Sequence, residues 1–211
     1  MTERARAIFD GLLAKYPTLR DCETDIAAAF ESLDACYRDG GLLLVCGNGG
    51  SAADSDHMVG ELMKDFRAKR PLPTGLRAAV AAMGGGALGD VLQCGVPAVS
   101  LPGQTALMTA IGNDLGYDYV YAQQVIGFGN AKNCLFGVST SGNSKNIVNA
   151  GIAAKALGMK TVALTGAGGG KMRELFDVSI CVPETKTEAI QELHLPVYHA
   201  LCAMLEAEHF G

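Results

Sequence analysis

The sequence predicts an α/β protein with one parallel β-sheet covered by helices on both faces. Five short apolar runs are spaced along the chain: LLLVC (42–46), PAVSL (97–101), NCLFGV (133–138), KTVALT (160–165) and DVSICV (177–182). Strands that are buried on both faces have continuous apolar runs of this kind, which is typical of parallel sheets. The chain has 211 residues and is 49% hydrophobic, so one sizeable core and a single domain over residues 1–211 are expected.

The stretches between these runs have helical patterns. Between Pro17 and Gly40, apolar residues recur at steps of three and four, and Gly40-Gly41 ends the pattern, which predicts an amphipathic helix within an N-terminal helical region (residues 1–40). A glycine turn after the first strand leads into a helix from about Ala52 to Phe66. Further helices are expected near 105–111, 117–127, 144–157, 171–175 and 187–209. Residues 78–90, rich in Ala and Gly, are expected to form a loop, lid or short extra helix.

Composition favours a small-molecule partner. The formal net charge is −5 with a pI near 5.3, and Lys and Arg are scattered, so neither a nucleic acid nor an anionic membrane is an expected partner. The uncharged stretch 91–113 is interrupted by Gly and Pro, which argues against a membrane helix. The first ten residues lack the apolar region of a secretory signal, and the seven cysteines form no CxxC pair. A cytoplasmic protein with reduced thiols is expected.

Two glycine-rich turns raise the question of nucleotide binding. GNGGSA (47–52) fits GxGxxA, but no acidic residue ends a second strand where a dinucleotide fingerprint needs one to bind the ribose. TGAGGGKM (165–172) has the wrong spacing for a P-loop, and Met172 stands where Ser or Thr should bind magnesium. Both nucleotide interpretations are therefore disfavoured.

The segment STSGNSKN (139–146) predicts a phosphate site. It lies between an expected strand and an expected helix, and it carries four hydroxyl side chains, those of Ser139, Thr140, Ser141 and Ser144. Hydroxyls and the free N–H groups of a helix start are the groups that bind a phosphate monoester without arginine. The alternative is ordinary helix capping by Ser141 or Asn143.

Two helices carry candidate metal ligands or acid–base groups. His57 and Glu61 are four residues apart on the helix after the glycine turn, so they share one face. Such a pair can ligate a metal or place a base beside an imidazole, although it is often a surface pair without a role. Gln191, His194 and His199 lie on the last expected helix. His194 lies well round that helix from His199, so it is interpreted as structural or interfacial.

Taken together, these segments resemble the sugar isomerase (SIS) domain proteins, and among them the phosphoheptose isomerases. The matching segments run in order over nearly the whole chain: CGNGGSAADSDHMVGEL, TAIGNDLGYDYVYAQQV, GVSTSGNSKNIVNA, GMKTVALTGAGGGKM and IQELHLPVYH. The resemblance implies a five-stranded parallel sheet in a flavodoxin-like three-layer sandwich, and a homotetramer with sites at subunit interfaces. It also implies conversion of sedoheptulose 7-phosphate to D-glycero-D-manno-heptose 7-phosphate, a step of heptose and surface glycan biosynthesis.

The resemblance also assigns residues. It implies sugar contacts from Asn48, Gly49, Gly50, Ser51, Asn113, Asp114 and Gln191, and phosphate binding by Ser139, Thr140, Ser141 and Ser144. It implies one metal ion per subunit, usually zinc, bound by His57, Glu61, Gln191 and His199. Isomerisation through an enediol requires proton transfer between two carbons and between oxygens, for which Glu61 and His199 are the candidate base and acid.

Two features differ from the family pattern. Residues 71–95 resemble an insertion, and Glu188 and Ala189 occupy the region before IQE where the family usually has an Asp or Thr followed by Arg. Two alternatives to the isomerase are a non-catalytic SIS-domain regulator that binds the replication initiator DnaA and a sugar-phosphate sensor. The regulator resembles an isomerase that has lost the glutamate of the first site helix and the final histidine of the IQE…H segment. Because Glu61 and His199 are both present, the enzyme is favoured.

Overall fold

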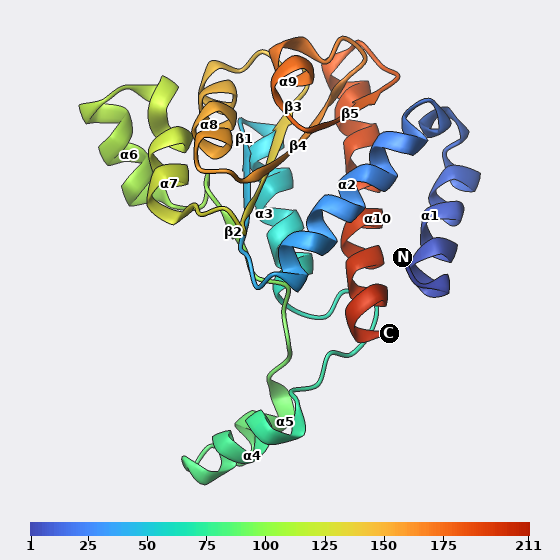
Figure 1. Cartoon of the computed structure of the whole chain (residues 1–211), viewed down its shortest axis with the longest axis vertical. Helices are drawn as coiled ribbons and strands as arrows, with labels where there is room; N and C mark the ends of the chain where they lie inside the picture. The colour runs from blue at the N-terminus through green and yellow to red at the C-terminus, as the bar shows by residue number, and fades with distance from the viewer.

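A five-stranded parallel sheet lies between two layers of helices in the computed structural model, which describes residues 1–211 (Figure 1). The strand order is β2-β1-β3-β4-β5. The strands are β1 (Leu43–Gly47), β2 (Ala98–Ser100), β3 (Cys134–Ser139), β4 (Lys160–Gly166) and β5 (Val178–Val182). All five coincide with the predicted apolar runs, and the order is that of the flavodoxin-like sandwich.

Helices cover both faces of the sheet and close two separate cores. The elements of the larger core are α1 (Glu3–Lys15), η1 (Pro17–Cys22), α2 (Glu23–Arg38), α3 (Gly50–Met63) and α10 (Thr187–Phe210). The elements on the other face are α6 (Thr105–Asp114), η2 (Tyr117–Tyr119), α7 (Val120–Phe128), α8 (Lys145–Ala156) and α9 (Gly170–Leu175). The two cores contain 32 and 15 buried residues, so α3 and α10 belong to the more extensively packed face.

The helix expected over 17–40 is divided in the structure. Its first six residues form the 3₁₀ helix η1, and α2 begins at Glu23. The division lies at Cys22, whose backbone dihedrals (φ −119°, ψ 20°) leave the α-helical region. The apolar periodicity continues across this point because Leu19, Cys22 and Ile26 are all buried in the same core.

Residues 71–93 form an arm that projects from the body of the molecule. The arm contains α4 (Thr74–Ala82) and α5 (Leu88–Val91), so the expected short extra helix in this region is present as two helices. An antiparallel bridge between Pro71 and Gln93 closes its base. Figure 1 shows that it leaves the end of the molecule where α3 ends, at the far end from the start of α8. No residue of α4 is buried, and Met83 is 89% exposed.

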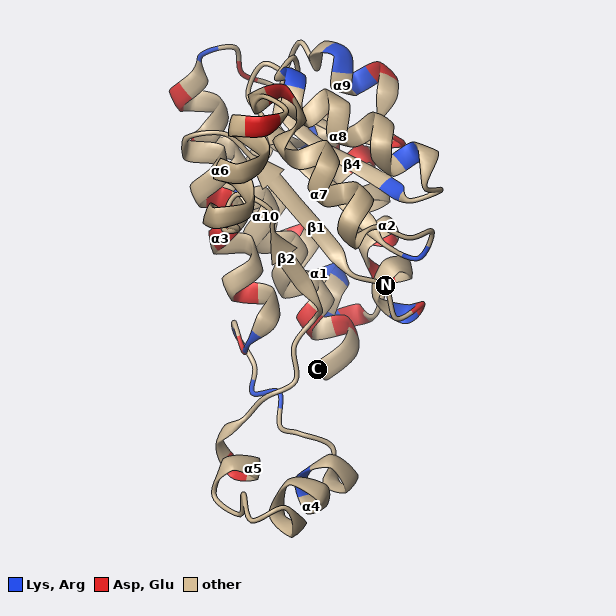
Figure 2. Ribbon diagram, turned by 90° about the vertical axis from the view of Figure 1, so that its left-hand side faces the viewer, with Lys and Arg blue, Asp and Glu red and all other residues tan.

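Lys and Arg are interspersed with Asp and Glu over the ribbon, and Arg77 and Asp90 pair with each other on the arm (Figure 2). None of the helices combines the length and the hydropathy that crossing a bilayer requires.

His194 is a buried histidine of α10 whose ring packs away from water. Its exposed fraction is 0%, and neither ring nitrogen has a hydrogen-bond partner. Burial lowers the pKa of His194 to about 4. The ring is therefore neutral in the folded protein at pH 7, as expected for a structural residue.

The depressed pKa of His194 predicts a loss of stability in weak acid. The unfolded chain takes up a proton below about pH 6.5, whereas the folded protein takes it up only near pH 4, so stability falls over this window. Between pH 7.5 and pH 5 the wild type should lose about 2 kcal/mol more than His194→Leu. Urea unfolding of both proteins at the two pH values measures this difference. Parallel losses in the two proteins would contradict the prediction.

Candidate active site

The glycine turn and the serine-rich turn lie side by side at the carboxyl ends of two adjacent strands. The glycine loop (residues 47–51) follows β1, the serine loop (residues 139–144) follows β3, and these strands pair in parallel. The connections leaving β1 and β3 lead to opposite faces of the sheet, α3 on one and α8 on the other (Figure 1). In open α/β sheets, this switch point at the carboxyl ends is where ligands bind.

The serine loop presents hydroxyl groups at the start of α8. The Oγ atoms of Ser139 and Ser144 are 2.9 Å apart, and Ser144 is the N-cap residue without a side-chain capping hydrogen bond. Ser141 Oγ accepts a hydrogen bond from the N–H of Asn143, and Asn143 Oδ1 accepts one from the N–H of Lys171. Ser141 and Asn143 therefore do not cap α8. The hydroxyls of Ser139 and Ser144 lie at the N-terminal end of α8, where the helix dipole favours negative charge.

Gly142 permits the serine loop to contact the turn after β4. Its φ is +64°, and a Cβ there would lie 2.0 Å from the carbonyl oxygen of Gly169. Both the dihedral and the contact exclude a side chain.

Gly142→Ala is expected to displace the serine loop and raise the KM for a phosphorylated substrate about tenfold, which corresponds to about 1.4 kcal/mol of binding free energy. Gly168→Ala is the matched control, because a Cβ at Gly168 meets nothing within 4 Å. Steady-state kinetics of the two variants measures the difference. An unchanged KM in Gly142→Ala would show that substrate binding does not depend on this loop.

Asn48 connects the glycine loop to the serine-loop helix. The side-chain amides of Asn48 and Asn146 exchange two hydrogen bonds, each 2.9 Å long. The hydroxyl of Tyr117 donates to Asn48 Oδ1 at 3.0 Å, and that of buried Tyr121 donates to the carbonyl oxygen of Gly47. Asn146, Tyr117 and Tyr121 were not predicted from the sequence as site residues. These contacts join positions about 70 to 100 residues apart, which local patterns do not reveal.

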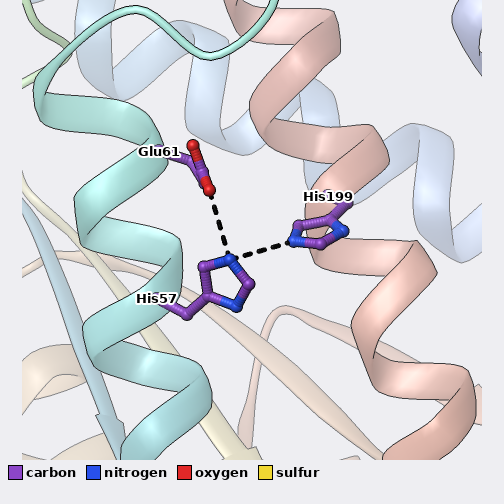
Figure 3. Close-up of side chains that lie close together, drawn as sticks. All are labelled: His57, Glu61 and His199. Atoms are coloured by element: carbon purple, nitrogen blue, oxygen red, sulfur yellow. Dashed lines mark hydrogen bonds and ion pairs between the residues drawn. The ribbon is translucent and has the colours of Figure 1, made fainter.

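Three of the predicted metal or catalytic residues meet between α3 and α10. Figure 3 shows His57 and Glu61 on α3 and His199 on α10 pointing toward one another. His57 Nε2 lies 3.2 Å from Glu61 Oε1 and 3.3 Å from His199 Nε2, and the three ligand atoms are all within 4.8 Å of one another. We call this set the His-Glu-His cluster.

The donor atoms of the His-Glu-His cluster fit a metal ion. Ligand atoms bound to one zinc ion at about 2.0–2.1 Å in a tetrahedron lie about 3.3 Å from each other, which matches the two shortest separations. Two histidines and one carboxylate are also the ligands of open, catalytic metal sites. Burial, together with the neighbouring His57, lowers the pKa of His199, so its ring is neutral and has a lone pair available at pH 7.

The remaining predicted residues lie apart from this cluster. The side-chain amide of Gln191 packs on the glycine loop, where its Nε2 lies 2.6 Å from the position of a Cβ on Gly50, and it makes no hydrogen bond to the cluster. Asn113 and Asp114 are exposed at the end of α6, where Asn113 Nδ2 donates a hydrogen bond to Asp114 Oδ1 at 2.8 Å. Neither contacts the other candidate residues through a hydrogen bond. Within one chain, Gln191 therefore meets the glycine loop, whereas the side chains of Asn113 and Asp114 hydrogen-bond only to each other.

A cavity of about 510 Å³ lies between α1 and α10 and is bordered by His199. Lys15, Tyr16, Arg67 and Glu192 are among its lining residues. The volume suits a small ligand, and two of these side chains are cationic. No residue of the serine loop lines it, so the cavity and the hydroxyl-rich loop are separate features of one chain.

Comparison with known proteins identifies the family. The sequence model described as the SIS domain matches residues 17–82 and 76–166. Phosphoheptose isomerase from Akkermansia muciniphila is 36% identical over 211 residues, which is 100% of both chains. The chain belongs to the SIS-domain family of phosphoheptose isomerases. The regulator and sensor alternatives are therefore set aside, and the protein is an enzyme.

Solved structures of the same family agree with this fold. The phosphoheptose isomerase GmhA from Neisseria gonorrhoeae superposes with a TM-score of 0.74 and 35% identity, covering 97% of this chain and 98% of that one. A phosphoheptose isomerase from Francisella tularensis gives a TM-score of 0.76 and 31% identity, covering 98% and 100%. The predicted SIS architecture is confirmed over nearly the whole chain.

Proposed function

We propose that this phosphoheptose isomerase interconverts sedoheptulose 7-phosphate and D-glycero-D-manno-heptose 7-phosphate through an enediol, for heptose and surface glycan biosynthesis. The observation that carries the proposal is the meeting in one cluster of Glu61, on the helix that leaves the glycine loop, and His199 of α10. The reaction needs a carboxylate and an imidazole close together, and the names of the relatives support the substrate class.

In this proposal the chain binds the substrate by its phosphate and its hydroxyls. Ser139, Thr140, Ser141 and Ser144, with the N–H groups at the start of α8, bind the phosphate at a position favoured by the helix dipole. Asn48, Gly49, Gly50, Ser51 and Gln191 contact the sugar, and Asn113 and Asp114 add contacts. The Asn48–Asn146 pair holds the sugar-binding loop against the phosphate-binding helix.

The chain then transfers two protons. Glu61 removes the proton from the carbon next to the carbonyl and returns it to the neighbouring carbon, while His199 exchanges a proton between the two oxygens. Burial and the neighbouring His57 lower the pKa of His199, so its ring is neutral at pH 7 and accepts that proton while its lone pair does not ligate the ion. Each transfer contributes roughly 10²–10⁴ to the rate.

The proposal includes zinc as the cofactor. His57, Glu61 and His199 would hold the ion, with Gln191 as the fourth ligand expected from the family resemblance. When bound, a zinc ion polarises a carbonyl and stabilises negative charge on oxygen. Glu61 has two carboxylate oxygens, so one can ligate the ion while the other accepts a proton.

A cytoplasmic homotetramer with sites at subunit interfaces completes the proposal. The separation of Asn113 and Asp114 from the His-Glu-His cluster supports a site completed by another subunit. Exposed apolar side chains on and between α6 and α7, namely Leu107, Leu115, Tyr119, Ile126 and Phe128, support association through that side. We also propose that residues 71–95, which contain the arm, are an insertion into the single SIS domain.

The test is incubation of the zinc-loaded wild type with sedoheptulose 7-phosphate, with formation of the aldose followed by NMR. Fructose 6-phosphate, which shares the phosphate and the ketose group, is the control for substrate length. Turnover of the seven-carbon sugar is expected and should stop when the metal is chelated. An inactive zinc-loaded wild type would refute the substrate assignment.

A further inference from the structure

A buried tyrosine hydroxyl lies on the side of His57 away from the other cluster residues. Tyr198 is 1% exposed, and its hydroxyl is 3.0 Å from His57 Nδ1 and 3.3 Å from Asp54 Oδ1. The other ring nitrogen of His57, Nε2, faces Glu61 and His199. The two nitrogens of one imidazole therefore contact different partners, one inside the cluster and one behind it.

When His57 Nε2 ligates a metal ion, the contacts of Tyr198 and Asp54 place the ring proton on Nδ1. Without a metal, an Nε2–H that donates to Glu61, 3.2 Å away, gives as many hydrogen bonds. Tyr198 has a single hydroxyl proton, whereas the Asp54 carboxylate can only accept. If Tyr198 donated to His57 Nδ1, the oxygens of Tyr198 and Asp54 would face each other without a proton between them. If Tyr198 donates to Asp54 and His57 Nδ1–H donates to Tyr198, both contacts are hydrogen bonds. The second arrangement leaves the Nε2 lone pair directed at Glu61 and His199.

We propose that Asp54 and Tyr198 are positioning residues that hold His57 in its Nδ1–H tautomer, with Nε2 aimed into the His-Glu-His cluster as a metal ligand. The inference rests on the metal site of the proposed function. Outer hydrogen bonds of this kind fix the ring and the tautomer of a metal-binding histidine, and their loss typically weakens metal binding 10–100-fold. Here the hydroxyl of Tyr198 stands between the carboxylate and the imidazole.

The two residues are tested by different substitutions. Tyr198→Phe removes only the hydroxyl and keeps the ring that packs beneath His57. Asp54→Asn keeps the size of the side chain but can donate a hydrogen bond to Tyr198, so the hydroxyl turns toward His57 Nδ1 and favours the Nε2–H tautomer. Asp54 makes no hydrogen bond to the His57 ring, but its charge acts on His57 directly as well as through Tyr198. Tyr198→Phe leaves that charge in place, so it is the variant that isolates the hydroxyl.

The experiment measures Zn²⁺ affinity by competition with a chromophoric chelator, without sugar. Tyr198→Phe and Asp54→Asn should each bind Zn²⁺ about 10–100-fold more weakly than the wild type. Tyr37→Phe is the matched control because it removes the hydroxyl of a tyrosine on α2 that packs on His209 rather than on the cluster, and it should bind Zn²⁺ as the wild type does. Circular dichroism shows that each variant is folded. Nitrogen-15 NMR of the zinc-loaded wild type at pH 8 should show His57 bound through Nε2 and protonated at Nδ1.

Three results would overturn the inference: no Zn²⁺ binding by the wild type, wild-type affinity in both folded variants, or His57 without a proton on Nδ1 in the zinc-loaded wild type. These readouts need no substrate. If the variants weaken Zn²⁺ binding but the wild type does not convert sedoheptulose 7-phosphate, the substrate proposal fails and the positioning roles stand. If the wild type is active and both variants bind Zn²⁺ normally, only the positioning roles fail.

Discussion

Glu61→Gln is expected to lower kcat for sedoheptulose 7-phosphate by roughly 10²–10⁴, because the amide cannot accept the proton that leaves the carbon. The substitution keeps the size of the side chain and, through its oxygen, one possible contact to His57. Substrate binding depends on the serine loop and the glycine loop, so KM should change by much less than kcat. Steady-state kinetics with zinc-loaded protein separates the two parameters.

A second readout distinguishes loss of the base from loss of the metal. In heavy water the wild type should exchange deuterium into the carbon-bound position of the sugar, and Glu61→Gln should not. Bound zinc is measured in the same samples. Glu31→Gln on the exposed face of α2 is the control for removal of one carboxylate and should behave as the wild type. If Glu61→Gln binds zinc and still turns over at the wild-type rate, Glu61 is not the base, although the family assignment is unaffected.

The sheet was predictable because each strand is apolar along its whole length. The five runs were visible without a structure, since strands covered on both faces lack polar alternation. Their ends were less certain at the edge of the sheet. PAVSL suggested five residues, but β2 contains only Ala98–Ser100, because this strand pairs with β1 alone. The division of the helix at Cys22 was not predicted, because burial continues across it.

The site was predictable where its residues share one element. The four-residue spacing of His57 and Glu61 places them on one face, and the structure shows them 3.2 Å apart. The partnership of His199 with this pair came from the family resemblance, since nothing in the spacing places α10 beside α3. Asp54 and Tyr198 were not predicted for the same reason. Asp54 is on the same helix as His57, but its hydrogen-bond partner Tyr198 is 144 residues away in sequence.

A buried ion pair that sequence reasoning did not predict joins the end of α3 to α10. Arg70 and Glu206 have side chains that are 0% and 2% exposed, and Arg70 Nε donates to Glu206 Oε1 at 2.8 Å. The guanidinium also donates to the carbonyl oxygens of Leu62 and Glu61, which end α3. Glu206 accepts the backbone N–H groups of three consecutive residues, Phe66 to Ala68. The pair therefore fixes the helix that carries His57 and Glu61 against the helix that carries His199.

Glu206→Gln is expected to reduce the free energy of unfolding by about 3–5 kcal/mol, because it leaves the Arg70 charge buried without a counterion. Burial alone would raise the pKa of Glu206, but the N–H donors and Arg70 together lower it. The carboxylate thus stabilises the fold above its unfolded pKa of about 4.5, and this contribution is lost as the pH falls below that value. Urea unfolding at pH 7.5, where the carboxylate is fully charged, measures the full effect.

The exposed pair Arg77–Asp90 on the arm provides the matched control. Asp90→Asn removes the same kind of interaction where water screens it, so it should cost at most about 1 kcal/mol. The double variant Arg70→Met/Glu206→Leu leaves no unpaired charge in the core, but it removes the acceptor of the Phe66, Arg67 and Ala68 N–H groups, so it should not recover wild-type stability. In the double variant, the carbonyl oxygens of Leu62 and Glu61 at the end of α3 lose their hydrogen bonds from Arg70. Its zinc affinity should therefore stay below that of the wild type. Equal losses of unfolding free energy in Glu206→Gln and Asp90→Asn would show that burial of the Arg70–Glu206 pair has no special weight for stability. Wild-type zinc affinity in the double variant would show that the metal site does not depend on this pair.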